Sequence, residues 1–180
     1  MSVRKYGDWN RALEIMQGIE ARYDRAVNRG LHRVGVHVRD KIKRGIRDQA
    51  PGGVPFAPLH PLTIAAKGSS KALIDNGDMV GAIAYKIASP EQVFVGLLRT
   101  AVNKKGEELA NLGHIHEFGR IVKVTPKMRG YLAAALGLHL KPDTVAITIP
   151  ARPFLRPVLD AEKGEVVKIF QKELQSIFLE

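Results

Sequence analysis

The closest grouping of metal-ligand side chains in the sequence is His114, His116 and Glu117. Imidazole and carboxylate groups are ligands of zinc sites, so a hydrolytic metal centre at these residues is one hypothesis. The two histidines lie two positions apart, whereas the helical His-Glu-x-x-His motif separates its histidines by four. Because no fourth ligand is evident, we favour a structural interpretation. In it, a histidine at a helix end bonds backbone carbonyls and Glu117 pairs with a nearby base.

Two other groups of side chains invite a chemical interpretation, and each has a simpler structural one. Asp75 and Asp78 could form a pair of carboxylates, but Asp75 is well placed as a helix N-cap with Asp78 in the acidic position of a capping box. A hairpin turn at Asn76-Gly77 is the alternative, although its flanks do not alternate. The segment 68–71, Gly-Ser-Ser-Lys, lacks the spacing of a phosphate-binding loop. We therefore expect no enzyme: no catalytic residue, no cofactor, no metal site and no small-molecule substrate.

Composition narrows the class of protein further. The chain has 180 residues and no cysteine, which excludes a disulfide scaffold, thiolate catalysis and cysteine-ligated zinc or iron–sulfur sites. At about 150 residues per domain, this length predicts a single domain over residues 1–180. No apolar run approaches the roughly 18 residues needed to span a bilayer, so we expect no membrane partner.

The net charge of +10 is concentrated near the N-terminus, because residues 1–50 hold 12 basic and 6 acidic side chains, a difference of +6. A basic helix attracts nucleic acid through its phosphates, so a DNA-binding protein is one alternative. Aromatic residues make up only 6% of the chain and do not alternate with the basic ones, which favours a solvated or protein-docking face and leaves non-specific DNA contact as a secondary expectation. The basic residues in question are Arg22, Arg25, Arg29, Arg33 and Arg39.

A long amphipathic helix is the element that carries these charges. Apolar residues follow one another at gaps of three and four from Trp9 to Ile46, which predicts one helix of about 55 Å. Gly30 and Gly35 are the expected positions for a bend. A stripe this long exceeds what one small core covers, so we expect its exposed part to bind other copies. The residues that we expect at this oligomer interface are Trp9, Leu13, Met16, Tyr23 and Val27.

The remaining pattern predicts an α+β fold with about four mainly antiparallel strands, short helices, and a C-terminal helix packed on the sheet. Alternation predicts strands at 84–88, 92–98, 120–125 and 143–149. Short helices are expected at 61–67, after Asp75, and at 109–118, while 126–140 is either helical or irregular. The chain thus divides into a basic helix (1–49), a Pro/Gly-rich loop (50–71), a sheet core (72–160) and a C-terminal helix (156–180).

Three strings, in this order between two helices, resemble the virion morphogenesis or tail-completion proteins of tailed phages, including the Mu-like, P2-like and prophage members. The strings are Leu-Ile-Asp-Asn-Gly-Asp-Met-Val-Gly-Ala-Ile (73–83), Ile-His-Glu-Phe-Gly (115–119) and Ile-Pro-Ala-Arg-Pro-Phe-Leu-Arg-Pro (149–157). The first departs from the family pattern at Asn76, where a threonine is usual, and at its Gly-Ala-Ile end.

The resemblance implies a non-enzymatic structural protein of the neck, where the tail meets the head. It further implies a ring of six copies that contacts other neck or tail proteins, assembled in the host cytoplasm and retained in the virion. From the residues themselves we expect these strings to specify the fold, with Phe118 and Phe154 buried. Arg152 either packs or bonds carbonyls or a neighbour's carboxylate. The fold-specifying positions are Asp75, Gly77, His116, Glu117, Phe118, Gly119, Pro150, Arg152, Pro153 and Phe154.

Overall fold

A computed structural model of the chain describes residues 7–104 and 106–178, so the ends of the predicted basic segment and of the predicted C-terminal helix, residues 1–6 and 179–180, lie outside it. The fold is α+β, as the sequence predicts. The described chain divides into two compact units. The first unit holds the residues up to His37, Tyr85–Phe94 and those from Lys163 on; the second holds Val38–Ala84 and Val95–Glu162. In the described part of the chain, no helix has both the length and the hydropathy of a membrane span.

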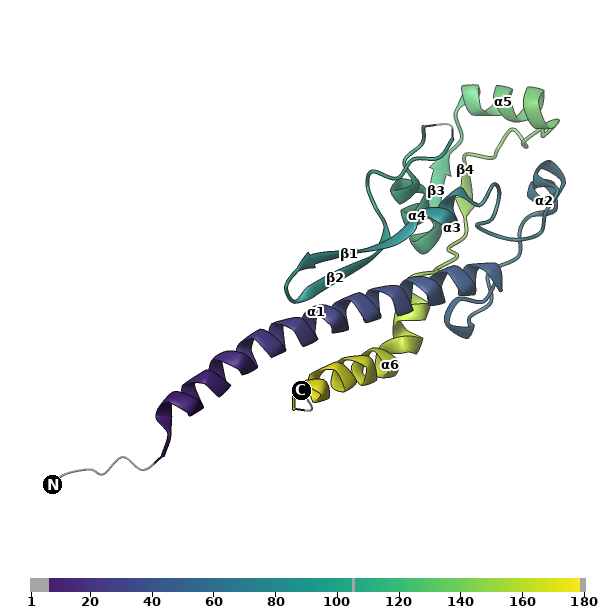
Figure 1. The fold of residues 1–180 in the computed structure, drawn as a ribbon. Coiled ribbons are helices and arrows are strands. Elements are labelled where there is room, and N and C mark those ends of the chain that lie inside the picture. Colours follow the sequence, from purple (N-terminus) through teal and green to yellow (C-terminus); the bar gives the residue numbers. More distant parts are fainter. Residues whose placement is uncertain (1–6, 105, 179–180) are drawn as a thin grey trace. The chain divides into compact units, whose positions relative to one another are not determined.

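The N-terminal helix α1 (Trp9–Arg47) is continuous, which confirms the periodicity of its apolar residues (Figure 1). The two glycines expected as positions for a bend, Gly30 and Gly35, lie within it, and both allow close packing. A Cβ at Gly30 would lie 3.0 Å from the ring of Phe170, and one at Gly35 would collide with the ring of Tyr85. These positions therefore lack side chains because neighbouring aromatic rings occupy the space.

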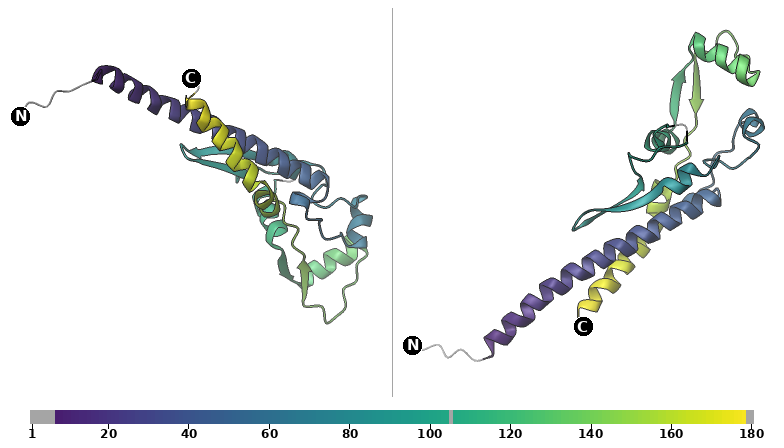
Figure 2. Two further views of the ribbon diagram at one scale, coloured as in Figure 1. Left: turned by 90° about the horizontal axis from the view of Figure 1, so that it is seen from below. Right: turned by 45° about the horizontal axis from the view of Figure 1, so that its top comes forward.

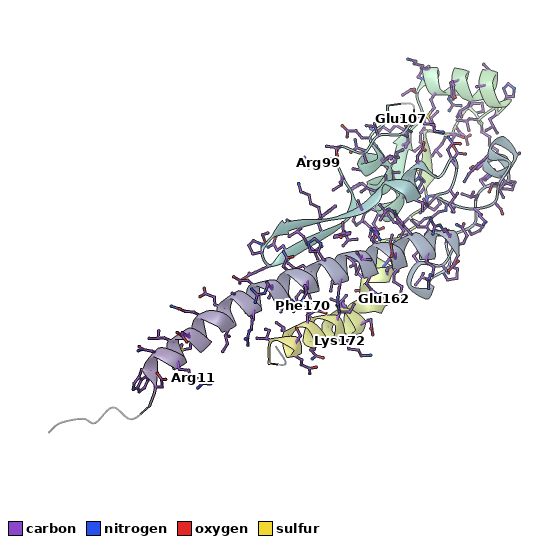
Figure 3. All side chains as sticks on the ribbon, in the orientation of Figure 1. Arg11, Arg99, Glu107, Glu162, Phe170 and Lys172 are labelled. Carbon is purple, nitrogen blue, oxygen red and sulfur yellow. The ribbon has the colours of Figure 1, made fainter. Side chains whose placement is uncertain are left out.

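The first unit packs two further elements against its part of α1. One is the C-terminal part of α6 (Arg156–Gln175) with the short 3-10 turn η2 (Ser176–Phe178). The other is the hairpin of β1 (Ile83–Ser89) and β2 (Gln92–Leu97), whose outer turn belongs to this unit. Figure 3 labels Phe170 on the side of α6 that faces α1.

The second unit contains most of the short elements. In chain order these are η1 (Pro51–Gly53), α2 (Pro61–Lys67), α3 (Asp78–Ala82), α4 (Leu109–Phe118), β3 (Arg120–Lys123), α5 (Pro126–Leu136) and β4 (Ala146–Ile149). Figure 2 shows β3 and β4 side by side with α5 at one end of the pair. The segment 126–140, for which the sequence allows either a helix or an irregular loop, is mostly helical. Thr125 caps α5 by accepting a hydrogen bond from the Met128 N–H at 3.2 Å.

The four strands form two separate two-stranded sheets, β1–β2 and β3–β4. In the second pair, Arg120 lies opposite Ile149 and Lys123 opposite Ala146, in antiparallel register. Both strands are shorter than predicted, with four residues each. Pro150 follows β4 directly, and a proline cannot donate to a ladder, so pairing stops there.

Each of the two units has its own buried apolar side chains among the described residues. In the first unit the buried apolar side chains include Ala26, Leu31, Val34 and Ile177. In the second unit they include Val38, Ile42, Ile46, Met79, Val80, Ile83, Leu109, Phe154 and Val158. The buried Phe154 confirms the expectation that this residue fills the junction between the last strand and the last helix.

Candidate functional site

The first 15 residues of α1 carry an exposed apolar stripe, which we call the α1 stripe. Its members lie at gaps of three and four on one side of the helix, and each leaves two fifths or more of its surface open. The members, with their exposed fractions, are Trp9 61%, Leu13 55%, Met16 68%, Ile19 41% and Tyr23 52%. Four of the five predicted interface residues therefore lie exposed, while the fifth, Val27, is half-buried.

The α1 stripe is exposed because the packing partners of α1 within the first unit end before it begins. The contacts of α6 and η2 with α1 involve Gly30, Arg29 and Arg33. From Ala26 to Trp9, α1 extends about 25 Å further toward its N-terminus, at 1.5 Å per residue (Figures 1 and 2). Large aromatic and aliphatic side chains exposed to this degree present on the order of 500 Å² of apolar surface. An exposed apolar patch of this size is often functional.

A buried carboxylate fixes α6 against α1 just where the stripe ends. Glu173 is 4% exposed and accepts from the Arg29 Nε at 3.1 Å, and Arg33 forms a second ion pair with it. Arg29 also donates to the Ser176 hydroxyl at 2.9 Å. This cluster was not predicted from the sequence. The available signal is that Glu173 falls on the buried face of α6, three and four residues from apolar neighbours.

This cluster bears on the DNA-binding alternative. Three of the five arginines that this alternative requires are engaged with carboxylates. Arg29 and Arg33 pair with Glu173, and Arg39 pairs with Asp40 at 2.8 Å. An arginine held by a carboxylate is a weaker phosphate ligand. The basic surface that remains on this part of α1 is smaller than the sequence suggests.

In the second unit, Glu117 joins the second and third strings of the sequence. Glu117 is 8% exposed, and its carboxylate accepts hydrogen bonds from three successive backbone N–H groups. They belong to Phe154 at 2.8 Å, Leu155 at 3.0 Å and Arg156 at 2.9 Å. Because Arg156 begins α6, the carboxylate satisfies amides that have no partner within the helix. The expectation that Glu117 pairs with a base is therefore wrong.

Arg152 anchors the Pro/Gly-rich loop from the other side of the same junction. Its guanidinium donates to the carbonyls of Ala57 and Pro58, both at 2.9 Å, and its backbone N–H donates to the His116 carbonyl at 2.6 Å. The expected bonding to carbonyls is confirmed. Burial lowers the pKa of Arg152 from its usual value, in keeping with a residue that is 6% exposed.

Of two predictions for the second string, one is confirmed and the other is wrong. Gly119 ends α4 with a φ of 74°, and a Cβ there would lie 3.0 Å from the Ile149 carbonyl oxygen, so the C-cap prediction is confirmed with a steric reason. Phe118 is 64% exposed, so its expected burial is wrong. Its ring lies 4.8 Å from the ring of His114 on the outer side of α4. The last turn of α4 turns Glu117 inward, which leaves the next position facing out.

The first string, residues 73–83, also differs in conformation from the predicted side-chain cap. The N-cap of α3 is Gly77, with a φ of 82°, and no side chain caps the helix, so neither the Asp75 cap nor the hairpin turn is formed. Asp75 and Asp78 instead line a cavity of about 460 Å³, together with His116 and residues of α2 and α4. The three strings thus meet in one region of the second unit.

His116 has an unusual environment in this cavity wall. Its Nδ1 is buried without a hydrogen-bond partner, so the expected bonding of the ring to carbonyls is wrong. Burial, followed by the positive charges of Arg152 and Lys67, holds the pKa of His116 below its ordinary value. Within residues 7–104 and 106–178, no three His, Asp or Glu side chains come together as metal ligands. The carboxylate of Glu117, which the metal hypothesis requires, is turned toward backbone amides.

Two further anchoring side chains were not predicted. Gln49, with a φ of 61° just after α1, donates through Nε2 to the carbonyls of Ile46 and Ala72 and accepts from the Ala72 N–H. Arg129 donates to the carbonyls of four residues between α5 and β4, namely Leu140, Lys141, Pro142 and Thr144. Long-range bonds from side chains to backbone carbonyls leave no periodic signal in a sequence.

Comparison of the chain with models of protein families, with curated proteins and with solved structures found no match.

Proposed function

We propose that this protein is a structural subunit of a tailed phage or prophage particle that acts in tail completion or head–tail joining at the neck. It works as an oligomeric ring and is assembled in the host cytoplasm before it enters the virion. The resemblance of the three strings and their meeting in one region of the second unit support this proposal. The self-association that a ring requires is carried by the α1 stripe.

The size of the α1 stripe suits a subunit interface. A specific protein–protein interface buries about 800 Å² on each partner. The roughly 500 Å² of apolar surface on the stripe is a large share of that area, and its Trp and Tyr are the residue types that dominate interface energetics. Burial of such a surface favours association, and the fit of the aromatic anchors rather than the area alone sets the affinity.

The charges beside the stripe favour a second copy of this chain as the partner. Residues 9–25 contain three basic and three acidic side chains, and both signs are interspersed along the helix. Two such segments can align with opposite charges together, whereas a strongly basic or acidic partner would meet like charges as often as opposite ones. The charged residues are Arg11, Glu14, Glu20, Arg22, Asp24 and Arg25.

The test measures the mass of the assembly by size-exclusion chromatography with light scattering. The wild-type chain is expected to form a closed oligomer, and Leu13→Glu with Met16→Glu is expected to yield monomers that remain folded. Gln17→Glu, on the exposed part of the same helix turn, is the matched control and leaves the mass unchanged. A wild-type chain that stays monomeric at every concentration and never enters particles contradicts the proposal.

The DNA-binding alternative has its own test. Binding to duplex DNA is measured as salt is raised, because contacts to phosphates weaken steeply with salt. Binding in dilute buffer that is lost in the Arg22→Ala, Arg25→Ala variant supports this alternative. No binding in dilute buffer removes it.

A further inference from the structure

Within the strand itself, which ends at Pro150, β4 lacks the protection that edge strands of natural proteins usually carry. Charged side chains, prolines and bulges normally discourage pairing with another chain. Residues 144–149, Thr-Val-Ala-Ile-Thr-Ile, contain no charge, and five of the six are β-branched. Val145 is 77% exposed. The partner strand β3 differs, because Arg120 and Lys123 lie at its two ends.

The ladder geometry shows which backbone groups of β4 are open. The Val124 N–H donates to the Val145 carbonyl at 2.9 Å, and the register pairs Val122 with Ile147. Since bonded and non-bonded pairs alternate in an antiparallel ladder, Ala146 and Thr148 direct their N–H and C=O groups away from β3. No described residue forms a hydrogen bond to these groups. They form a free edge ready to accept a strand.

The same chain holds a second incomplete sheet. A two-stranded sheet is marginal alone, and three or more strands with a hydrophobic face give independent stability. The strand β2 (Gln-Val-Phe-Val-Gly-Leu) is also uncharged, has β1 as its one neighbour in the described sheet, and leaves Phe94 45% exposed. Its neighbour β1 carries Lys86. Among the four described strands, the two without a charged residue are therefore β2 and β4.

We propose that β2 of one copy pairs with β4 of the next copy, which joins the two half-sheets into one four-stranded sheet across each subunit boundary. This inference rests on the proposed function, and it names a contact that repeats between each copy and the next around the ring. A contact between two different surfaces is heterologous, and heterologous contacts close into rings when the rotation allows. The α1 stripe supplies apolar area, while the strand pairing fixes the register between neighbours.

Edge variants test the pairing without disturbing the ladder inside one copy. Thr148→Pro removes an N–H that faces away from β3, and prolines are tolerated at such positions. Ala146→Lys adds the protecting charge that the edge lacks. Both variants are expected to shift the oligomer to monomer or to open, heterogeneous species, with unchanged circular dichroism. Thr148→Val, which keeps the N–H and a β-branched side chain, is the matched control and assembles as the wild type does.

Disulfide trapping provides a second readout, made simple by the absence of native cysteine. Thr148→Cys is mixed with either Phe94→Cys or Gln92→Cys under mild oxidation, and linked heterodimers are expected for one of the two registers. Thr148→Cys mixed with Lys172→Cys on α6 is the control and is not expected to link.

The two proposals fail in different ways. An oligomer that depends on the α1 stripe, but neither links through these cysteines nor responds to Thr148→Pro and Ala146→Lys, overturns the strand pairing and leaves the proposed function standing. A wild-type chain that is monomeric throughout overturns the proposed function itself.

Discussion

The Glu117 carboxylate offers a direct test of how the second unit is held together. Glu117→Ala removes the acceptor of three backbone N–H groups at 2.8–3.0 Å. Each hydrogen bond to a charged group contributes about 1.5–3 kcal/mol. Water can reach the partly buried amides of Leu155 and Arg156 in the variant, which recovers part of the loss. We therefore expect the free energy of unfolding to fall by about 4 kcal/mol.

The amide variant separates charge from shape. Glu117→Gln keeps one oxygen, which can still accept from Phe154 and Leu155 through the position of Oε2. It places an NH₂ group against the Arg156 N–H and removes the negative charge from the start of α6. We expect a loss of about 2 kcal/mol, roughly half that of the alanine variant.

Urea titration followed by far-UV circular dichroism measures both losses. Glu165→Gln is the control, because Glu165 is an exposed α6 carboxylate that meets Lys168 at 3.6 Å, and its loss should stay within about 0.5 kcal/mol. Glu117 variants that unfold at the same urea concentration as the wild type would refute the assignment of this carboxylate as the group that holds the α4–α6 junction.

Three further predictions concern other positions. Gly45→Ala is expected to destabilise the chain, because the new Cβ would lie 2.6 Å from the Pro51 Cα. Gly18→Ala, in the same helix, has open space around the new Cβ and should stabilise the chain by about 0.5–1 kcal/mol. Thermal unfolding compares the two variants. The pKa of His116 is lowered in the folded chain, so the unfolded chain binds more protons at this residue. The free energy of unfolding should therefore fall as the pH drops below about 6.5. His116→Asn should flatten this pH dependence in urea titrations from pH 7 to 5. Glu173→Gln should cost about 1–2 kcal/mol, since both of its arginine partners are partly exposed and can regain water, and a loss no larger than that of Glu165→Gln would contradict this.

Periodic features were predictable from the sequence. The apolar periodicity from Trp9 to Ile46 predicts one helix, and α1 has the expected bounds. The helix α4 begins and ends at the predicted residues, 109 and 118. The exposure of Trp9, Leu13, Met16 and Tyr23 also follows from length, because a helix of about 55 Å exceeds the elements that pack on it. These are local properties, and spacing alone encodes them.

Features that depend on distant partners were not predictable. Asp75 has the sequence context of a cap, yet the chain reaches α3 through a left-handed Gly77. Phe118 is exposed because tertiary bonding directs Glu117 inward, which reverses the usual preference for burying the aromatic residue. The division of four strands into two pairs depends on which edges meet in space, and alternation says nothing about that choice.

The position of the Glu117 and Arg152 bonds has a consequence for how this protein could diversify. The stretch from Gly119 to Ala151, which includes β3, α5 and β4, is an excursion whose two ends are clasped together at its root. Each doubling of the length of a flexible segment whose ends are held together costs only about 0.6 kcal/mol in loop-closure entropy. Insertions near α5 therefore leave the root undisturbed, so evolution can reshape this outlying tip to fit a new neighbour while the remainder of the chain stays as it is.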